Sequence, residues 1–199
     1  MPAKLDDKKL HMVIEAAIFV ADKPMSIEKL KQTIFADDKV SKARIKSAIV
    51  QLQSEYQERG VSLVRVSNGY RFQAKTELAP WLGKLWTEKP AKYSRALLET
   101  LALIAYKQPI TRGEIENVRG VSVSSNIMRT LSDRNWIKVV GHKEVPGRPS
   151  LYATTSDFLD YFSLASLDQL PQLMEPEALE LVAKRIESEF MGVSVEETR

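Results

Sequence analysis

One order of predicted elements occurs twice in this sequence, and this repetition limits what the chain can fold into. Each copy has a long apolar helix that ends near a proline, then a second helix, a third helix and two β-rich runs. Pro24 and Ser26 mark the first connection, and Pro109 and Thr111 mark the second with the same spacing. The repetition predicts two similar small domains in tandem.

Local signals assign the segments of each copy. Apolar residues recur at spacings of three and four over residues 8–21, as on the buried face of a helix. Ser41 and Gly60 are placed to cap the two ends of a third helix. Asn68-Gly69 predicts a tight two-residue turn between strands. Three helices and a hairpin are typical of the winged helix. We therefore predict a mainly α protein with small β-hairpin wings (α+β), built as two tandem winged-helix domains.

Charge differs along the chain in step with this division. We predict a first winged-helix domain over 1–90, a second over 91–165, and an acidic tail over 166–199 with a short helix followed by disorder. Lys and Arg outnumber Asp and Glu by 16 to 11 and by 10 to 7 in the two domains, whereas the tail has 3 against 8. A mixed-charge surface accounts for this modest basic excess, and it leaves a weak, non-specific DNA contact open.

Several classes of protein are excluded by what the sequence lacks. It contains no cysteine and only two histidines, His11 and His142, so we expect no disulfide and no structural zinc site of the usual kind. It has no Ser-His-Asp set and no Gly-rich phosphate loop, so we expect neither enzymatic activity nor a cofactor. It has no signal-peptide pattern and no apolar run of about 18 residues, so we expect a cytoplasmic protein without a membrane span.

A DNA-binding transcription regulator is the alternative that the fold raises, because the third helix of a winged helix reads a DNA groove. Lys42, Arg44 and Lys46 begin this helix in the first domain, and Asn126 and Arg129 lie on it in the second. These helices are only mildly basic, which argues against tight operator binding.

The segment over residues 77–86 is unusually rich in large apolar side chains for a short helix. It holds Trp81, Leu82, Leu85 and Trp86. The core of a small domain uses one or two of them. The others are candidates for an interface, where aromatic side chains dominate the binding energy.

Long stretches of the second domain resemble one known family. Residues 96–121, ALLETLALIAYKQPITRGEIENVRGV, and 147–155, GRPSLYATT, are similar to bacterial segregation and condensation protein B. Leu170-Pro171 fits as well, and the resemblance covers roughly residues 10–172. Departures occur at 123–127 and at Asn135-Trp136, where the Trp136 ring alters the contacts expected at a strand entry.

The resemblance implies a non-catalytic adaptor subunit of the bacterial condensin-like complex, which acts in chromosome condensation and partition. Members of this family dimerise chiefly through the amino-terminal domain. The homodimer binds the kleisin subunit, segregation and condensation protein A, which bridges the ATPase heads of an SMC protein. The resemblance thus also implies a nucleoid-associated location in the cytoplasm.

Candidate partner-binding residues are placed on matched positions and on the aromatic segment. A groove between the turn and the wing of the second domain can dock a peptide, and Arg119 and Arg148 can pair with acidic kleisin residues. Gly147 and Pro149 also fit the wing backbone without any partner. The full set comprises Pro109, Ile110, Arg119, Gly147, Arg148, Pro149, Trp81 and Trp86.

Overall fold

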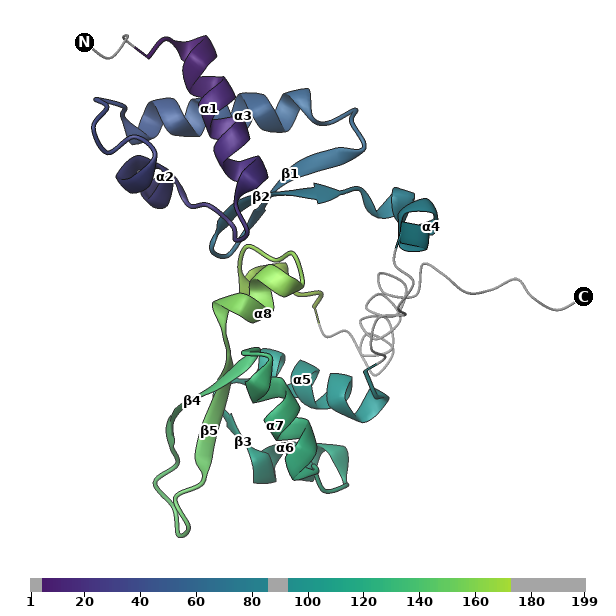
Figure 1. Ribbon diagram of the computed structural model, residues 1–199. Coiled ribbons are helices and arrows are strands. Elements are labelled where there is room, and N and C mark those ends of the chain that lie inside the picture. The colour runs from purple at the N-terminus through teal and green to yellow at the C-terminus, as the bar shows by residue number, and fades with distance from the viewer. Residues whose placement is uncertain (1–4, 86–92, 173–199) are drawn as a thin grey trace, which may run out of the picture.

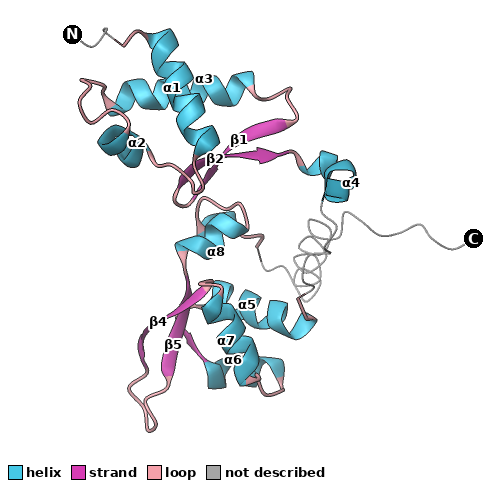
Figure 2. Cartoon of the chain, viewed as in Figure 1, coloured by secondary structure: helices cyan, strands magenta, loops and turns pink. Residues whose placement is uncertain are grey.

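The computed structural model describes residues 5–85 and 93–172. Within these ranges the chain forms two winged-helix domains, each with three helices, a hairpin wing and a hydrophobic core of its own (Figures 1 and 2). The predicted mainly α fold with two tandem winged-helix domains is therefore confirmed. The predicted boundary near residue 90 lies outside the described residues.

The first domain has the predicted element order. Its elements are α1 (Asp7–Val20), α2 (Ile27–Thr33), α3 (Lys42–Glu55), β1 (Val61–Val66) and β2 (Gly69–Ala74). The side chains of Asp6, Ser26 and Ser41 each accept a hydrogen bond from the backbone N–H three residues later. The two serine caps expected from the sequence are confirmed, because this contact depends only on local spacing.

The predicted end of α3 at Gly60 was wrong. The helix stops at Glu55, and Tyr56 is its C-cap. The Tyr56 ring is buried and packs against Phe72 with ring centroids 4.7 Å apart. The chain then turns over residues 57–60 and enters β1, so packing on the hairpin ends the helix before the glycine.

The segment after β2 is not the single helix that the sequence predicts. It consists of η1 (Thr76–Leu78), α4 (Ala79–Leu82) and η2 (Gly83–Leu85), which are a 3₁₀ turn, one α-helical turn and a second 3₁₀ turn. Pro80 lies in the first turn of α4. Proline has no N–H to donate, so it can begin a helix but breaks one that is already under way.

The second domain repeats the first and extends it. Its elements are α5 (Arg95–Lys107), β3 (Ile110–Thr111), α6 (Arg112–Arg119), α7 (Ser125–Asp133), β4 (Ile137–His142), β5 (Ser150–Thr154), α8 (Ser156–Tyr161) and η3 (Leu167–Gln169). Ser94, Thr111 and Ser124 cap α5, α6 and α7 through their side chains. Gly120 ends α6 with φ of 69°, the left-handed conformation expected of a C-cap glycine.

A short strand that the sequence did not reveal joins the helices to the wing. In the second domain β3 pairs with β5, and the sheet order is β3-β5-β4, all antiparallel. In the first domain a single bridge between Met25 and Tyr70 takes this place. Ile110 and Met25 each directly follow the repeated proline. One or two residues are too few to show a strand pattern, which is why this pairing was missed.

The wing of the first domain turns one residue earlier than predicted. Gly69 pairs with Val66, so the two turn residues are Ser67 and Asn68. Gly69 has φ of 141°, and a Cβ built on it would come within 3.0 Å of the Met25 carbonyl group and the Ser26 nitrogen. The glycine is needed where the Met25 backbone crosses the strand, and this requirement overrides the turn preference.

Trp136 lies in the core of the second domain, with 2% of its surface exposed. Its ring centroid lies 4.6 Å from that of Tyr161, 5.3 Å from that of Tyr93 and 5.4 Å from that of Phe162. The bulky ring at the strand entry thus joins β4 to α8 and to the residues before α5. Such tilted and edge-on aromatic pairs add stabilisation to the area that they bury.

The packed part of the second domain continues past the predicted boundary at residue 165. Leu164 and Leu170 pack on its core. The Tyr106 hydroxyl of α5 donates a hydrogen bond to the carbonyl oxygen of Pro171 at 2.8 Å. The first residues assigned to the tail therefore belong to the domain surface, and the predicted tail helix lies outside the described residues.

Replacing Gly69 with alanine should destabilise the first domain by about 2–4 kcal/mol, because the new Cβ meets backbone and φ is unfavourable for an L side chain. Denaturant unfolding followed by circular dichroism measures this effect. Gly113→Ala is the matched control, since no atom lies within 4 Å of its Cβ position. It should change stability by about 1 kcal/mol or less. Equal effects of the two substitutions would contradict this account of Gly69.

Candidate protein-binding surfaces

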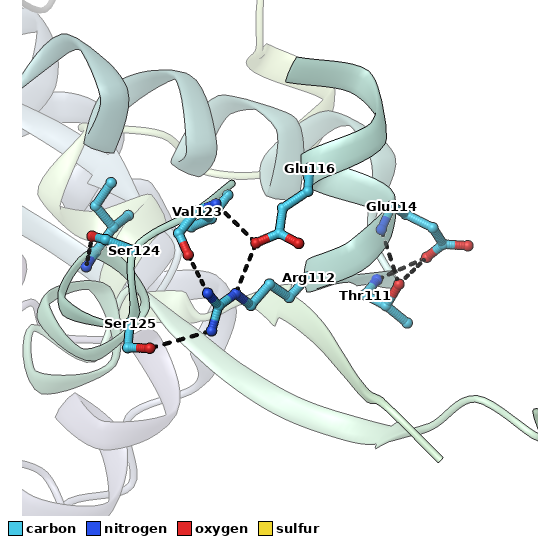
Figure 3. A network of polar contacts seen from close by, with 8 residues as sticks. Thr111, Arg112, Glu114, Glu116, Val123, Ser124 and Ser125 are labelled. Carbon is cyan, nitrogen blue, oxygen red and sulfur yellow. Dashed lines mark hydrogen bonds and ion pairs between the residues drawn. The ribbon is translucent and has the colours of Figure 1, made fainter. Parts of the chain in front are cut away.

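The turn between α6 and α7 is held by a charged network inside the second domain (Figure 3). Arg112 donates from Nε to Glu116 Oε1 at 3.0 Å, from Nη1 to the Ser125 hydroxyl at 3.3 Å, and from Nη2 to the Val123 carbonyl oxygen. Glu116 Oε1 also accepts from the Val123 N–H at 2.8 Å. This bond from the backbone, followed by the one from Arg112, lowers the pKa of Glu116. The network fixes the position of α7 relative to α6.

A second carboxylate joins the start of α6 to the wing. Glu114 and Thr111 form a capping box, in which Thr111 donates its N–H and its hydroxyl to Glu114 Oε2, both at 2.8 Å (Figure 3). Lys143, at the beginning of the wing loop, donates from Nζ to Glu114 Oε1 at 2.5 Å. The bond from Lys143, helped by those from Thr111, lowers the pKa of Glu114 to about 2. The wing base is thereby tied to the helix-turn-helix.

The tip of the second wing has two successive residues with positive φ. Gly147 has φ of 85° and Arg148 has φ of 37°. Arg148 donates its N–H to the Val145 carbonyl at 2.9 Å, and the Pro149 carbonyl accepts from the Lys143 N–H at 2.9 Å. The Arg148 guanidinium pairs with Glu144 at 3.1 Å in an exposed contact. An exposed pair of this kind contributes little stability and can exchange for a partner carboxylate.

The predicted partner-binding residues of the second domain do not form one patch. Pro109 is exposed at the start of β3, after a cis Gln108-Pro109 bond. Ile110, beside it, is 4% exposed and belongs to the core. Arg119 lies at the opposite end of α6 from the wing contacts. The structure therefore gives Ile110 a packing role and leaves Pro109 and the wing tip at the surface.

Arg119 is committed to a contact within the domain. Its side chain is 9% exposed, and Nη2 lies 3.1 Å from Glu99 Oε2 on α5. Burial alone would raise the pKa of Glu99, but hydrogen bonds from Arg95 and Arg119 together lower it. The Arg119 side chain thus holds α6 against α5, and a kleisin carboxylate would have to displace Glu99 to reach it.

Three of the basic side chains expected to face DNA, Lys42, Arg44 and Arg129, are paired with acids of the same domain. In the first domain Lys42 lies 2.8 Å from Glu28, and Arg44 lies 2.5 Å from Asp7. In the second domain Arg129 lies 3.6 Å from Asp133. Each pair reduces the positive charge available to phosphates, which is the main source of affinity in non-specific DNA binding.

Trp81 is exposed, as expected for an interface residue rather than a core residue. Its side chain is 66% exposed on α4, and Leu85 on η2 is 73% exposed. Neither residue belongs to the core clusters among the described residues. Trp86, the other predicted anchor of this segment, lies outside the described residues.

An apolar stripe on α1 was missed by the sequence analysis. Met12, Ala16, Phe19 and Val20 are all exposed, and Phe19 is 69% exposed. Their spacing of four, three and one places them on a second face of the helix, while Leu10, Ile14 and Ile18 fill the core. The sequence did contain this information, because the predicted helix has apolar residues on two faces. Both faces of such a helix are expected to be buried, one by the core of the domain and the other by a partner.

Neither a metal cluster nor a spanning helix occurs in the part of the chain that the structure describes. No group of three or more His, Cys, Asp or Glu side chains there could hold a metal ion. None of the described helices is both long enough and apolar enough to cross a membrane.

Comparison with known proteins identifies the family. The family model described as segregation and condensation complex subunit ScpB matches residues 12–173. The chain belongs to the ScpB family. A segregation and condensation protein B homolog of Coxiella burnetii is 53% identical over 179 residues, which cover 90% of this chain and 84% of that protein. Segregation and condensation protein B of Syntrophotalea carbinolica is 40% identical over 173 residues, covering 86% and 85%.

Two solved ScpB structures also match. The crystal structure of ScpB from Mycobacterium tuberculosis is 34% identical and covers 81% of this chain and 99% of that one, with a TM-score of 0.38. A structure described as a dimer of the ScpB N-terminal domain complexed with a ScpA peptide is 28% identical. It covers 41% of this chain and 94% of that one, with a TM-score of 0.34.

Stability should fall in acid partly through Glu114. Its folded-state pKa of about 2 is below the usual 4.5, so the folded protein favours the carboxylate. This contribution is complete above about pH 5 and is lost as the pH falls towards 2. Melting temperatures measured from pH 7 to pH 2 should therefore drop less steeply for Glu114→Gln than for the unmodified protein. An equally steep drop in the two proteins would contradict this role of Glu114.

Proposed function

We propose that this chain is a non-catalytic adaptor subunit in chromosome condensation and partition, which binds the kleisin ScpA and, through it, an SMC protein. The observation that carries the proposal is its membership of the ScpB family over residues 12–173. The proposal includes a cytoplasmic, nucleoid-associated location. Light scattering coupled to size exclusion tests it directly, because the chain and the kleisin of the same organism should elute as one stable larger species. A chain that ignores its kleisin at micromolar concentration would contradict it.

The exposed stripe of α1 is the surface that we propose for homodimerisation. It presents Met12, Ala16, Phe19 and Val20 on one continuous helix face. The Phe19 ring is also supported from below, since it packs edge-on against Phe72 at 5.9 Å. A supported aromatic ring that projects from a rigid helix is the kind of anchor that dominates interface energy. A two-fold contact of this helix with its copy would cover the stripe.

Phe19→Glu should convert the dimer to a monomer, raising the dissociation constant of the dimer by about 30-fold or more, because it places a charge in the proposed contact. Sedimentation or light scattering over a range of concentrations measures this change. Val118→Glu provides the matched control, since Val118 is a similarly exposed apolar residue on α6 of the second domain. It should remain dimeric. A Phe19→Glu protein that is folded and still dimeric would rule out the α1 stripe.

Kleisin contacts are proposed at the exposed aromatic segment and at the wing of the second domain. Trp81 and Leu85 present apolar surface without an intramolecular use in the described residues. Pro109, Gly147, Arg148 and Pro149 border the exposed side of the wing and its base. Within the described residues, the Arg148 guanidinium would give up its exposed pair with Glu144 when a partner carboxylate approaches. The proposed partner is therefore a segment with both apolar and acidic side chains.

Trp81→Ala should weaken ScpA binding by about 30-fold, because truncation of a buried aromatic anchor typically removes about 2 kcal/mol. Titration calorimetry with the purified kleisin measures this loss. Lys46→Ala is the control, because Lys46 is exposed on α3, where a DNA-reading helix would use it. It should bind ScpA normally. A Trp81→Ala protein with unchanged affinity would remove this segment from the proposed site.

The alternative function, a DNA-binding transcription regulator, predicts a strong dependence of binding on salt concentration. It requires affinity that falls steeply with salt concentration, because several phosphates must be neutralised. The ion pairs of Lys42, Arg44 and Arg129 with neighbouring acids disfavour it. A screen of binding to duplex DNA of many sequences, at two salt concentrations, separates a tight operator-reading protein from one that touches DNA weakly.

A further inference from the structure

The wing of the first domain is in contact with the second domain. Asn68, in the turn of this wing, donates its backbone N–H to Asp160 Oδ1 at 3.0 Å and its side-chain amide to Asp160 Oδ2 at 2.6 Å. Arg71 on β2 donates to the Ser163 hydroxyl at 3.0 Å, and that hydroxyl donates to Gln73 Oε1 at 3.0 Å. Figure 1 shows α8 lying beside the end of this hairpin. The carboxylate and the hydroxyl are both at the C-terminal end of α8.

Asp160 occupies a position that its own helix disfavours. It lies in the last turn of α8, where the carbonyl groups carry partial negative charge and a basic residue is preferred. Its two oxygens accept the two hydrogen bonds from Asn68. A backbone N–H and an amide group, both on one wing residue, thus supply the favourable interaction that α8 does not.

Ser163 also occupies a position that its local backbone disfavours. Its φ is 57°, and the helix ends with Ser163 N–H bonded to the Asp160 carbonyl and Leu164 N–H bonded to the Leu159 carbonyl. This is the Schellman pattern, whose left-handed residue is usually glycine. A serine is strained there, but glycine has no hydroxyl to join Arg71 and Gln73.

We propose that the C-terminal end of α8 is a docking site for the wing of the first domain of the same chain, and that this contact fixes the relative orientation of the two domains. Asp160 and Ser163 are both unfavourable for their local backbone, and both form hydrogen bonds in this contact. The proposal is independent of the kleisin-binding function.

The contact is polar and open to water. Asn68 and Ser163 are exposed, so each hydrogen bond competes with solvent and its net contribution is modest. While the contact is formed, the turn of the first wing is bound to protein and is not presented to nucleic acid.

The absence of cysteine makes a direct test simple. Lys31→Cys and Lys138→Cys place one label on α2 and one on β4, both at exposed positions. Pulsed dipolar electron paramagnetic resonance on the full chain, diluted with unlabelled chain, then reports only distances within one molecule. The otherwise unmodified protein should give one narrow distance distribution, and Asp160→Ala should broaden it.

Ser163→Gly is the decisive variant. It keeps the left-handed turn, and loss of the CH2OH side chain removes both the strain of the Cβ and the hydroxyl that joins Arg71 and Gln73. The melting temperature should therefore rise by a few degrees while the distance distribution broadens. Misfolding cannot produce that combination. Asp157→Ala is the control, because Asp157 lies on the same helix and bonds Asn135 within its own domain. It should leave the distribution narrow.

Two results would overturn the proposal. The first is a distribution that stays equally narrow in Asp160→Ala and Ser163→Gly. The second is a broad distribution in the parent together with a narrow distance between differently labelled chains. That second result would assign the α8 site to the wing of another copy instead.

Discussion

The backbone pairing between the segment after the first helix and the returning strand of the wing is the contact on which each domain depends. Met25 and Tyr70 exchange two hydrogen bonds of 2.9 Å in the first domain. Ile110 and Tyr152 are paired in the second. A two-stranded hairpin alone is only marginally stable in water. This additional backbone pairing holds each wing against its helices. In the first domain the pairing requires glycine at position 69, Gly69.

The same winged-helix geometry can serve DNA or protein, and in this chain several basic side chains are paired within their own domain. Arg112 is directed into the domain, where it and Glu116 hold the turn before α7. Lys143 is drawn to Glu114 and fixes the wing base. These two basic side chains thus hold elements of the second domain together. The apolar side chains exposed in the described part of the chain include Trp81 on α4 and the stripe on α1.

Several surface features are explained by a contact with a partner or with the other domain. The outer face of α1 exposes Met12, Phe19 and Val20, an apolar stripe that a partner would cover. Asp160 and Ser163 are poor choices for the end of an isolated helix and suitable ones for holding a wing. Residues that conflict with local preference thus indicate where long-range contacts lie. Arg119, by contrast, already pairs with Glu99 inside its own domain.

The sequence by itself determined the two-domain winged-helix order and the serine and threonine caps. Caps follow from a hydrogen bond spanning three residues, and the repeat makes each assignment twice. The tertiary structure decided the burial of Ile110, the pairing of Arg119, the one-residue shift of the turn at Gly69 and the docking of the first wing on α8. Each of these depends on atoms brought together from distant parts of the chain, and local spacing carries no information about them.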